Sequence, residues 1–116
     1  MPRAGEIWLA EIPFTSGVAS KLRPVLVLWE DATDVVVAAV TKAAPRSPTD
    51  VSLQDWAAAG LVVPSTVRLS RLDCLEQVLL RRRLGRISQG DVLLVKAAWL
   101  QHVRLQFCSL PPSGSG

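Results

Sequence analysis

Two apolar runs early in the chain constrain the fold more than any other feature of the sequence. The first, residues 23–28, reads Arg-Pro-Val-Leu-Val-Leu, and the second, residues 35–42, is rich in valine and ends on Thr-Lys. Such runs are typical of buried β-strands, and the short polar segment between them favours a hairpin. In an antiparallel pair the start of one strand lies beside the end of the other. We therefore expect Arg23 and Thr41 to lie together at one edge of a sheet. A guanidinium beside a hydroxyl suits a phosphate that gains negative charge during a reaction.

The rest of the chain predicts more short strands and one long helix. A helical turn or two is expected over residues 54–60, because Gly60 can end it. Ser88 with Asp91 three positions later is a variant of the capping box, and it predicts a helix from about Gln89 to about Phe107. Several short strands with a terminal helix predict an α+β, strand-rich fold with a barrel-like core. The further strands are expected at residues 5–12, 51–53, 61–63, 66–72 and 75–80, with a basic connector at residues 81–86.

Length and hydrophobicity set the domain organisation. The chain has 116 residues, 49% of them hydrophobic, which is enough for one domain with one core. We assign residues 1–109 to that domain and the Pro-, Ser- and Gly-rich residues 110–116 to a disordered tail. The mean hydropathy of +0.29 indicates apolar surface that a second copy covers. No apolar run is as long as a membrane span and no signal segment is visible, so we expect a cytoplasmic protein without a membrane partner.

Charge and metal-binding residue types narrow the function only partly. The net charge of +3 is compatible with RNA or with an acidic protein partner and proves neither. Cys74 and Cys108 lie far apart and His102 is the single histidine, so the spacing of a zinc site is absent and we expect no metal and no cofactor. The two cysteines are expected to be buried and reduced. His102 is expected to be packed against apolar neighbours of the terminal helix.

Three short motifs resemble one family of proteins. Gly5-Glu6-Ile7-Trp8, Arg23-Pro24 and Val40-Thr41 are similar to the corresponding segments of the MazF/PemK toxins, which are small ribonucleases of bacterial toxin–antitoxin pairs. The resemblance runs from Gly5 to about Phe107. It implies an SH3-like β-barrel of the PemK/CcdB kind, with a short internal helix and a C-terminal helix, assembled as a homodimer.

The resemblance also assigns catalytic roles. Arg23 matches the active-site arginine of the family, and Thr41 matches the Thr or Ser that accompanies it. From the residues alone, Arg23 could equally be an exposed arginine in a salt bridge, and Thr41 a strand residue chosen for β-propensity. The segment that ends at Arg68 resembles the strand that supplies a second arginine, a proposed proton donor, in Kid-like members. Those members carry an aspartate as proposed base two residues later, and this chain has Ser70 there, so that acid–base pair cannot be transferred.

The proposed RNA contacts surround this pair. The loop from Phe14 to Lys21 precedes the catalytic arginine and is expected to flank the site, since single-stranded RNA is bound by stacking on aromatic rings and by hydrogen bonds to base edges. Phe14 could instead belong to the core, and Lys42 could be a solvated loop charge. The complete set of expected RNA-binding residues is Phe14, Lys21, Lys42, Arg68 and Ser70.

The implied function is that of a toxin endoribonuclease. It would cut single-stranded RNA, mRNA in particular, without a metal, and leave a 2′,3′-cyclic phosphate and a 5′-hydroxyl. A cognate antitoxin would block the site, and operator DNA would be bound only together with the antitoxin. One alternative is a CcdB-like toxin that binds gyrase, although the terminal Trp-Gly-Ile of those toxins is absent here. Another is an inactive homologue that only binds antitoxin or operator, and Ser70 keeps that reading open.

Overall fold

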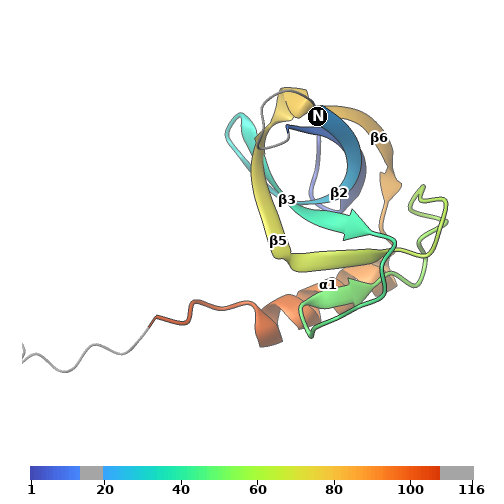
Figure 1. The fold of residues 1–116 in the computed structure, drawn as a ribbon, viewed down its shortest axis with the longest axis vertical. Coiled ribbons are helices and arrows are strands. Elements are labelled where there is room, and N and C mark those ends of the chain that lie inside the picture. The colour runs from blue at the N-terminus through green and yellow to red at the C-terminus, as the bar shows by residue number, and fades with distance from the viewer. Residues whose placement is uncertain (14–19, 108–116) are drawn as a thin grey trace, which may run out of the picture.

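The framework of the protein is one antiparallel six-stranded sheet with a single α-helix (Figure 1). The computed structural model describes residues 1–13 and 20–107. The sheet order is β4-β5-β3-β2-β1-β6. The elements are β1 (Glu6–Pro13), β2 (Ser20–Asp31), β3 (Asp34–Thr41), β4 (Asp50–Ser52), β5 (Thr66–Glu76), the 3-10 helix η1 (Gln77–Leu79), β6 (Leu80–Arg86) and α1 (Gln89–His102).

The predicted hairpin is the centre of this sheet. Strands β2 and β3 pair antiparallel from Asp31 opposite Asp34 to Val25 opposite Ala39, so the connecting turn has two residues. Ala32, in that turn, has a φ of 57°, a left-handed conformation that tight hairpin turns require. The apolar runs therefore meet along their length, as the sequence predicts.

The sheet curves strongly, so that Figure 1 shows it as an almost closed ring with α1 beneath. Its two outer strands, β4 and β6, form no ladder with each other within the described residues. The strand-rich α+β prediction is thus confirmed, and the expected barrel is a partly open one.

Both faces of the central strands are buried, which explains why their apolar runs are continuous rather than alternating. One face packs against α1 and the segment before β5, and the other face lines the interior of the curve. The first cluster includes Ile7, Leu26, Ala38, Val40, Val67, Leu69 and Val95. The second comprises Ala10, Val25, Val27, Val35, Val37, Leu75 and Leu80.

Helix α1 begins where the capping pattern predicts and ends earlier than expected. The Ser88 hydroxyl accepts a hydrogen bond from the Asp91 backbone N–H at 3.1 Å. The helix ends at His102 rather than near Phe107, because its apolar side chains have no sheet to cover beyond Val103 and Phe107 is exposed. His102 is exposed, so the expectation of a packed histidine was wrong. No helix in the described residues is long and apolar enough to cross a membrane.

Two short segments differ from the prediction. Residues 54–60 form a series of hydrogen-bonded turns, with a single helix-like bond from the Ala59 N–H to the Asp55 carbonyl at 3.2 Å. The short helix of this protein is η1 instead, which lies within residues 75–80, where a strand was expected. Residues 61–63 are not a strand. Cys74 is exposed rather than buried, since it alternates with the buried Leu75 along β5 and projects from the opposite face.

Candidate active site

The central hairpin brings Arg23 and Thr41 to the same end of the sheet. The ladder between β2 and β3 ends with Val25 opposite Ala39, and Arg23 and Thr41 each lie two residues beyond that pair on their own strands. Directly opposite residues in an antiparallel pair project from the same face. Arg23 and Thr41 therefore lie at the same end of the sheet, and both line the same groove.

One large groove, of about 1120 Å³, collects the residues predicted for the site. Phe14 is the exception, because it lies outside the described residues. The groove-lining members of the predicted set are Lys21, Arg23, Thr41, Lys42, Arg68 and Ser70. Four of these six carry a positive charge, which suits a phosphodiester backbone.

Neither Arg23 nor Thr41 is engaged in a way that would prevent a role in catalysis. Arg23 is exposed, and it takes part in none of the three ion pairs formed among the described residues. The Thr41 hydroxyl accepts a hydrogen bond from the Ala43 N–H at 3.1 Å. That bond fixes the oxygen and leaves the hydroxyl hydrogen available to donate to a ligand.

Arg68 is held by a buried carboxylate. Its Nε lies 3.5 Å from Oδ1 of Asp50, whose side chain is 1% exposed, against 25% for Arg68. These two atoms form no hydrogen bond, while Oδ2 of Asp50 accepts one from the Arg46 N–H at 2.8 Å. Asp50 therefore positions the guanidinium by charge, and the Arg68 donors can serve a ligand in the groove.

Sequence reasoning missed two charged residues of the groove, Arg71 and Asp73. It treated residues 66–72 as a regular strand, in which every second side chain would share a face. The ladder between β3 and β5 instead shifts register between Ala38 and Ala39. The only sequence signal for this irregularity is the break in apolar alternation around Ser70.

The segment before β5 forms a wall of the groove and is fixed to α1. Residues 60–63 line the groove. The two carboxylate oxygens of Asp91 accept hydrogen bonds from the N–H groups of Gln54 and Asp55, each at 2.9 Å, and Asp91 is 1% exposed. These bonds tie the start of residues 54–60 to α1, and they satisfy two partly buried backbone N–H groups.

The predicted basic connector, residues 81–86, is the edge strand β6. Two of its arginines pair with carboxylates of β1: Nε of Arg83 lies 2.8 Å from Glu6, and Nε of Arg81 lies 3.3 Å from Glu11. These contacts fasten the edge strand and leave Arg82 as an exposed neighbour without an ion pair in the described chain.

The surroundings of Glu6 shift the pKa of its carboxyl group. Burial acts to raise its pKa, but hydrogen bonds from the Trp8 indole at 3.0 Å, the Arg3 N–H at 2.8 Å and the Arg83 guanidinium, together with the charge of Arg83, outweigh it. The pKa of Glu6 is therefore below its usual value. The Glu6 carboxylate therefore holds β1 to β6 through Arg83, and it does not serve as a proton donor.

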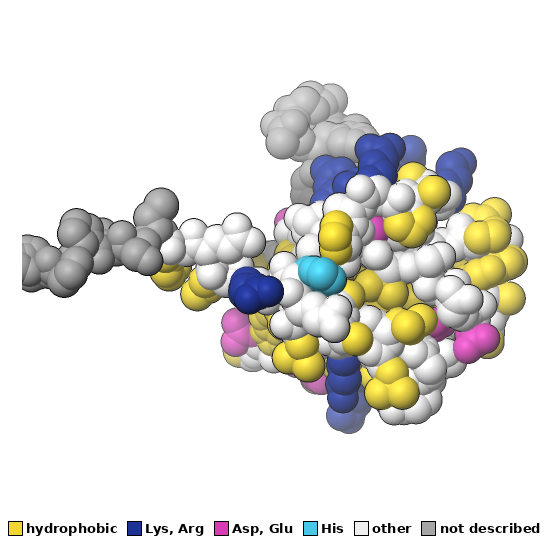
Figure 2. Space-filling view, turned by 90° about the horizontal axis from the view of Figure 1, so that it is seen from below, with side chains coloured by type: hydrophobic (Ala, Val, Ile, Leu, Met, Phe, Trp, Pro, Cys, Tyr) yellow, Lys and Arg dark blue, Asp and Glu magenta, His cyan; other side chains and the backbone are white. Residues whose placement is uncertain are grey.

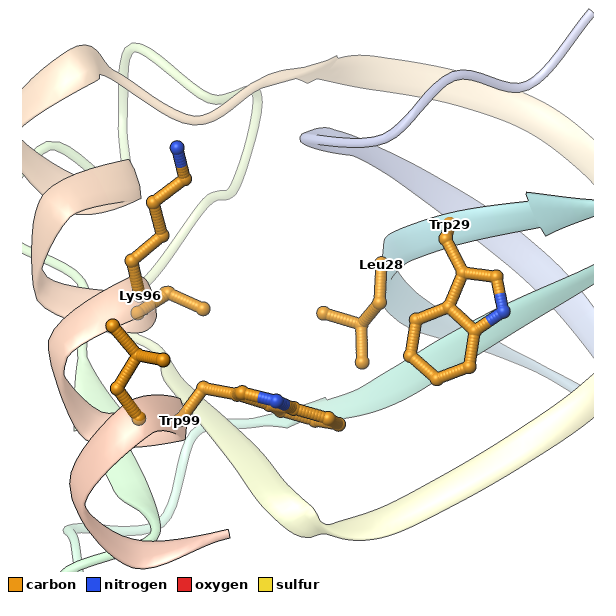
Figure 3. Close-up of a pocket in the computed structure, with 6 residues that line it drawn as sticks. Leu28, Trp29, Lys96 and Trp99 are labelled. Atoms are coloured by element: carbon orange, nitrogen blue, oxygen red, sulfur yellow. The ribbon is translucent and has the colours of Figure 1, made fainter. Parts of the chain in front are cut away.

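A second cavity, of about 470 Å³, is apolar (Figure 3). Trp29 from β2 and Trp99 from α1 stand edge to face there, with ring centroids 6.0 Å apart and planes at 85°. Trp29 is 43% exposed and Leu100 is 80% exposed. Figure 2 shows apolar side chains over this side of the molecule. The described residues that line it are Leu28, Trp29, Val95, Lys96, Trp99 and Leu100, and they offer contact surface and no carboxylate or imidazole.

Side chains that could ligate a metal do not gather in the described part of the chain: no three His, Cys, Asp or Glu residues form a cluster there. Among the described lining residues, the groove offers five cations, the hydroxyls of Thr41, Ser65 and Ser70, and one carboxylate.

Comparison with known proteins gives one family and one fold. A family model described as a PemK-like, MazF-like toxin of type II toxin–antitoxin systems matches residues 3–103. No curated protein matches the chain in sequence. An endoribonuclease in complex with its cognate antitoxin, from Mycobacterial species, superimposes with a TM-score of 0.71 at 17% identity, over 93% of this chain and 100% of that one. The Mycobacterium tuberculosis toxin MazF-mt6 superimposes with a TM-score of 0.66 at 26% identity, over 80% of this chain and 90% of that one. MazF from Deinococcus radiodurans superimposes with a TM-score of 0.62 at 25% identity, over 84% of this chain and 91% of that one.

Proposed function

This chain belongs to the PemK-like, MazF-like toxins of type II toxin–antitoxin systems, and we propose that it is an endoribonuclease that cleaves single-stranded RNA in its cationic groove. The resemblance read from the sequence is confirmed by the family match. Similar solved structures are described as endoribonucleases, which supports the same activity here. With cellular mRNA as the substrate, the toxin acts in the cytoplasm.

One observation carries the proposal: Arg23 and Thr41, from neighbouring strands of the hairpin, line one groove together with four further cations. The four are Lys21, Lys42, Arg68 and Arg71. Phosphate contacts of this kind supply most of the affinity for a nucleic-acid strand without reading its sequence. Ser70 and the loop that contains Phe14 are proposed to contact bases.

The reaction uses the nucleophile that RNA itself carries. The 2′-hydroxyl attacks the adjacent phosphorus and the 5′-oxygen leaves, which gives a 2′,3′-cyclic phosphate and a 5′-hydroxyl with no need for a metal. Arg23 stabilises the charge that accumulates on the non-bridging oxygens, because its own charge is permanent and placed in advance. The Thr41 hydroxyl donates a hydrogen bond to one of these oxygens.

The direct test replaces Arg23 and a matched arginine outside the groove. Purified protein is incubated with mixed RNA in EDTA, and the new ends are sequenced. We expect wild-type protein and Arg82→Ala to cut at the same short sequence. Arg23→Ala should be slower by about 10²–10³-fold, the usual cost of one preorganised charge stabiliser, with an unchanged melting temperature because the side chain is exposed. Near-wild-type cleavage by Arg23→Ala would remove Arg23 from the mechanism.

No cleavage by wild-type protein under any condition, with tight antitoxin binding retained, would identify an inactive homologue instead. We propose a cognate antitoxin as the partner that closes the groove. Solved structures of similar toxins, including one with its cognate antitoxin, support this, and the net charge of +3 suits an acidic segment. Operator DNA is bound only in that complex.

We propose a homodimer that uses the apolar side around the second cavity. Trp29 and Leu100 expose apolar surface there, and Lys96 is the only charged residue of the cavity lining. Such a surface fits a second copy of itself. Leu100→Asp should shift the protein to monomer by light scattering at micromolar concentration. The control Val78→Asp, on the exposed side of η1, should stay dimeric. A wild-type monomer would contradict the proposal.

A further inference from the structure

We propose that Asp73 is the general base that takes the proton from the attacking 2′-hydroxyl. This inference rests on the proposed ribonuclease function and adds the proton acceptor that the groove otherwise lacks. Its basis is an irregularity in β5 together with the charges of the groove.

The irregularity places Asp73 and Arg68 opposite β3 residues that are only two positions apart. Arg68 lies opposite Ala39 of β3, and Asp73 lies opposite Val37. In a regular ladder the residue opposite Val37 would be number 70, two positions after Arg68. The register shift between Ala38 and Ala39 inserts three residues, so the position that Ser70 would hold is taken by Asp73.

The same register puts the catalytic side chains on one face of the sheet. Val37, Ala39 and Thr41 alternate along β3 and share a face, and opposite residues share it too. Asp73 and Arg68 lie on that face from one side of β3, and Arg23 from the other. Along β3, residues two positions apart are separated by about 7 Å. A bound dinucleotide can span this distance.

Asp73 is also the only carboxylate in the described lining of the groove. It is exposed and forms no ion pair or hydrogen bond with another described side chain. Asp50 is nearby, but its side chain is 1% exposed and cannot reach a substrate. The single histidine, His102, is not among the described lining residues. Lysine and arginine hold their protons at neutral pH and cannot replace a carboxylate as base.

A carboxylate in a phosphate-binding groove repels the ligand, so its presence there calls for a functional reason. Here five cations surround the one negative charge, so the strand can still bind. During the reaction a bond forms between the 2′-oxygen and phosphorus, and the bond from phosphorus to the 5′-oxygen breaks. The proton of the 2′-hydroxyl passes to Asp73, the departing 5′-oxygen takes a proton from water, and Asp73 returns its proton to solvent.

The test compares Asp73→Asn with Asp31→Asn, which makes the same chemical change at the exposed hairpin turn. Cleavage rates are measured on an oligonucleotide that contains the mapped cut site. Binding is measured on the same oligonucleotide with hydrogen in place of the attacking 2′-hydroxyl. We expect Asp73→Asn to slow cleavage by about 10²–10⁴-fold, the usual contribution of a general acid or base. Its RNA affinity and melting temperature should stay near wild type, and Asp31→Asn should resemble wild type throughout.

A substrate with sulfur as the bridging 5′-atom separates a base from an acid. Its leaving group needs no proton, whereas attack by the 2′-hydroxyl still does. Asp73→Asn should therefore stay slow on this substrate, and full rescue would overturn the assignment. Weaker binding or an altered cut sequence with an unchanged rate would also overturn it, since Asp73 would then be reading a base. If wild-type protein cuts and Asp73→Asn cuts equally fast, only this inference fails; if wild-type protein does not cut, the proposed function fails with it.

Discussion

The buried carboxylate of Asp91 allows the sharpest prediction about how the groove is held together. Asp91→Ala removes two hydrogen bonds of 2.9 Å to the N–H groups of Gln54 and Asp55 and leaves both groups without a partner. The N-cap bond survives, because its donor is the backbone N–H of residue 91. The loss therefore belongs to the contact between α1 and residues 54–55 rather than to the start of the helix.

Its size follows from the charge and burial of the acceptor. A hydrogen bond to a charged group contributes about 1.5–3 kcal/mol, so the loss of both should lower the free energy of unfolding by about 3–6 kcal/mol. Since domains of this size are stable by about 5–15 kcal/mol, the variant should fold but melt far earlier. The matched control is Asp55→Ala in the same segment, whose exposed side chain should cost less than about 0.5 kcal/mol.

The measurement is urea unfolding followed by tryptophan fluorescence, with limited proteolysis of the native state to localise the effect. We expect a lower midpoint with an unchanged slope, and faster cleavage within residues 54–63. The reasoning would be refuted if Asp91→Ala cost less than about 1 kcal/mol or behaved like Asp55→Ala, because the two bonds would then hold nothing in place.

Three further predictions concern other parts of the fold. Thr41→Val should slow RNA cleavage by about 10²-fold. It should also lower the free energy of unfolding by about 1 kcal/mol, because the hydrogen bond from the Ala43 N–H is lost. Thr41→Ser should keep both the cleavage rate and the stability near wild type, and a failure of Thr41→Ser to do so would assign Thr41 to packing. The lowered pKa of Glu6 means that its ionised form stabilises the fold at neutral pH and that this contribution is lost as pH falls below 4.5. The stability gap between wild type and Glu6→Gln should therefore close on acidification, and a gap that widened would contradict the sign. Gly60 has a φ of +90° and its Cβ would clash with the carbonyl oxygen of Leu84 in β6, so Gly60→Ala should cost about 2–4 kcal/mol by thermal unfolding. Gly90→Ala, in an open helical position, should be neutral or stabilising.

The sequence by itself determined the central hairpin and, with it, the placement of Arg23 and Thr41 at one end of the sheet. Both follow from local information: two apolar runs, a short polar link, and a period that fixes which residues share a face. The start of α1 was equally local, because Ser88 and Asp91 satisfy N–H groups within one turn. Predictions of this kind depend on neighbours in sequence, and the structure agrees with them.

Only the tertiary structure decided where the less regular residues lie. The three-residue irregularity in β5 moves Asp73 into the position that Ser70 would hold, and no propensity at these residues requires it. The start of residues 54–60 is fixed by Asp91, more than thirty positions away, which accepts hydrogen bonds from the N–H groups of Gln54 and Asp55. The end of α1 and the exposure of His102 depend on where the sheet stops. In each case the deciding partner is distant in the chain, so its effect on hydrogen bonding or burial exists only once the fold has formed.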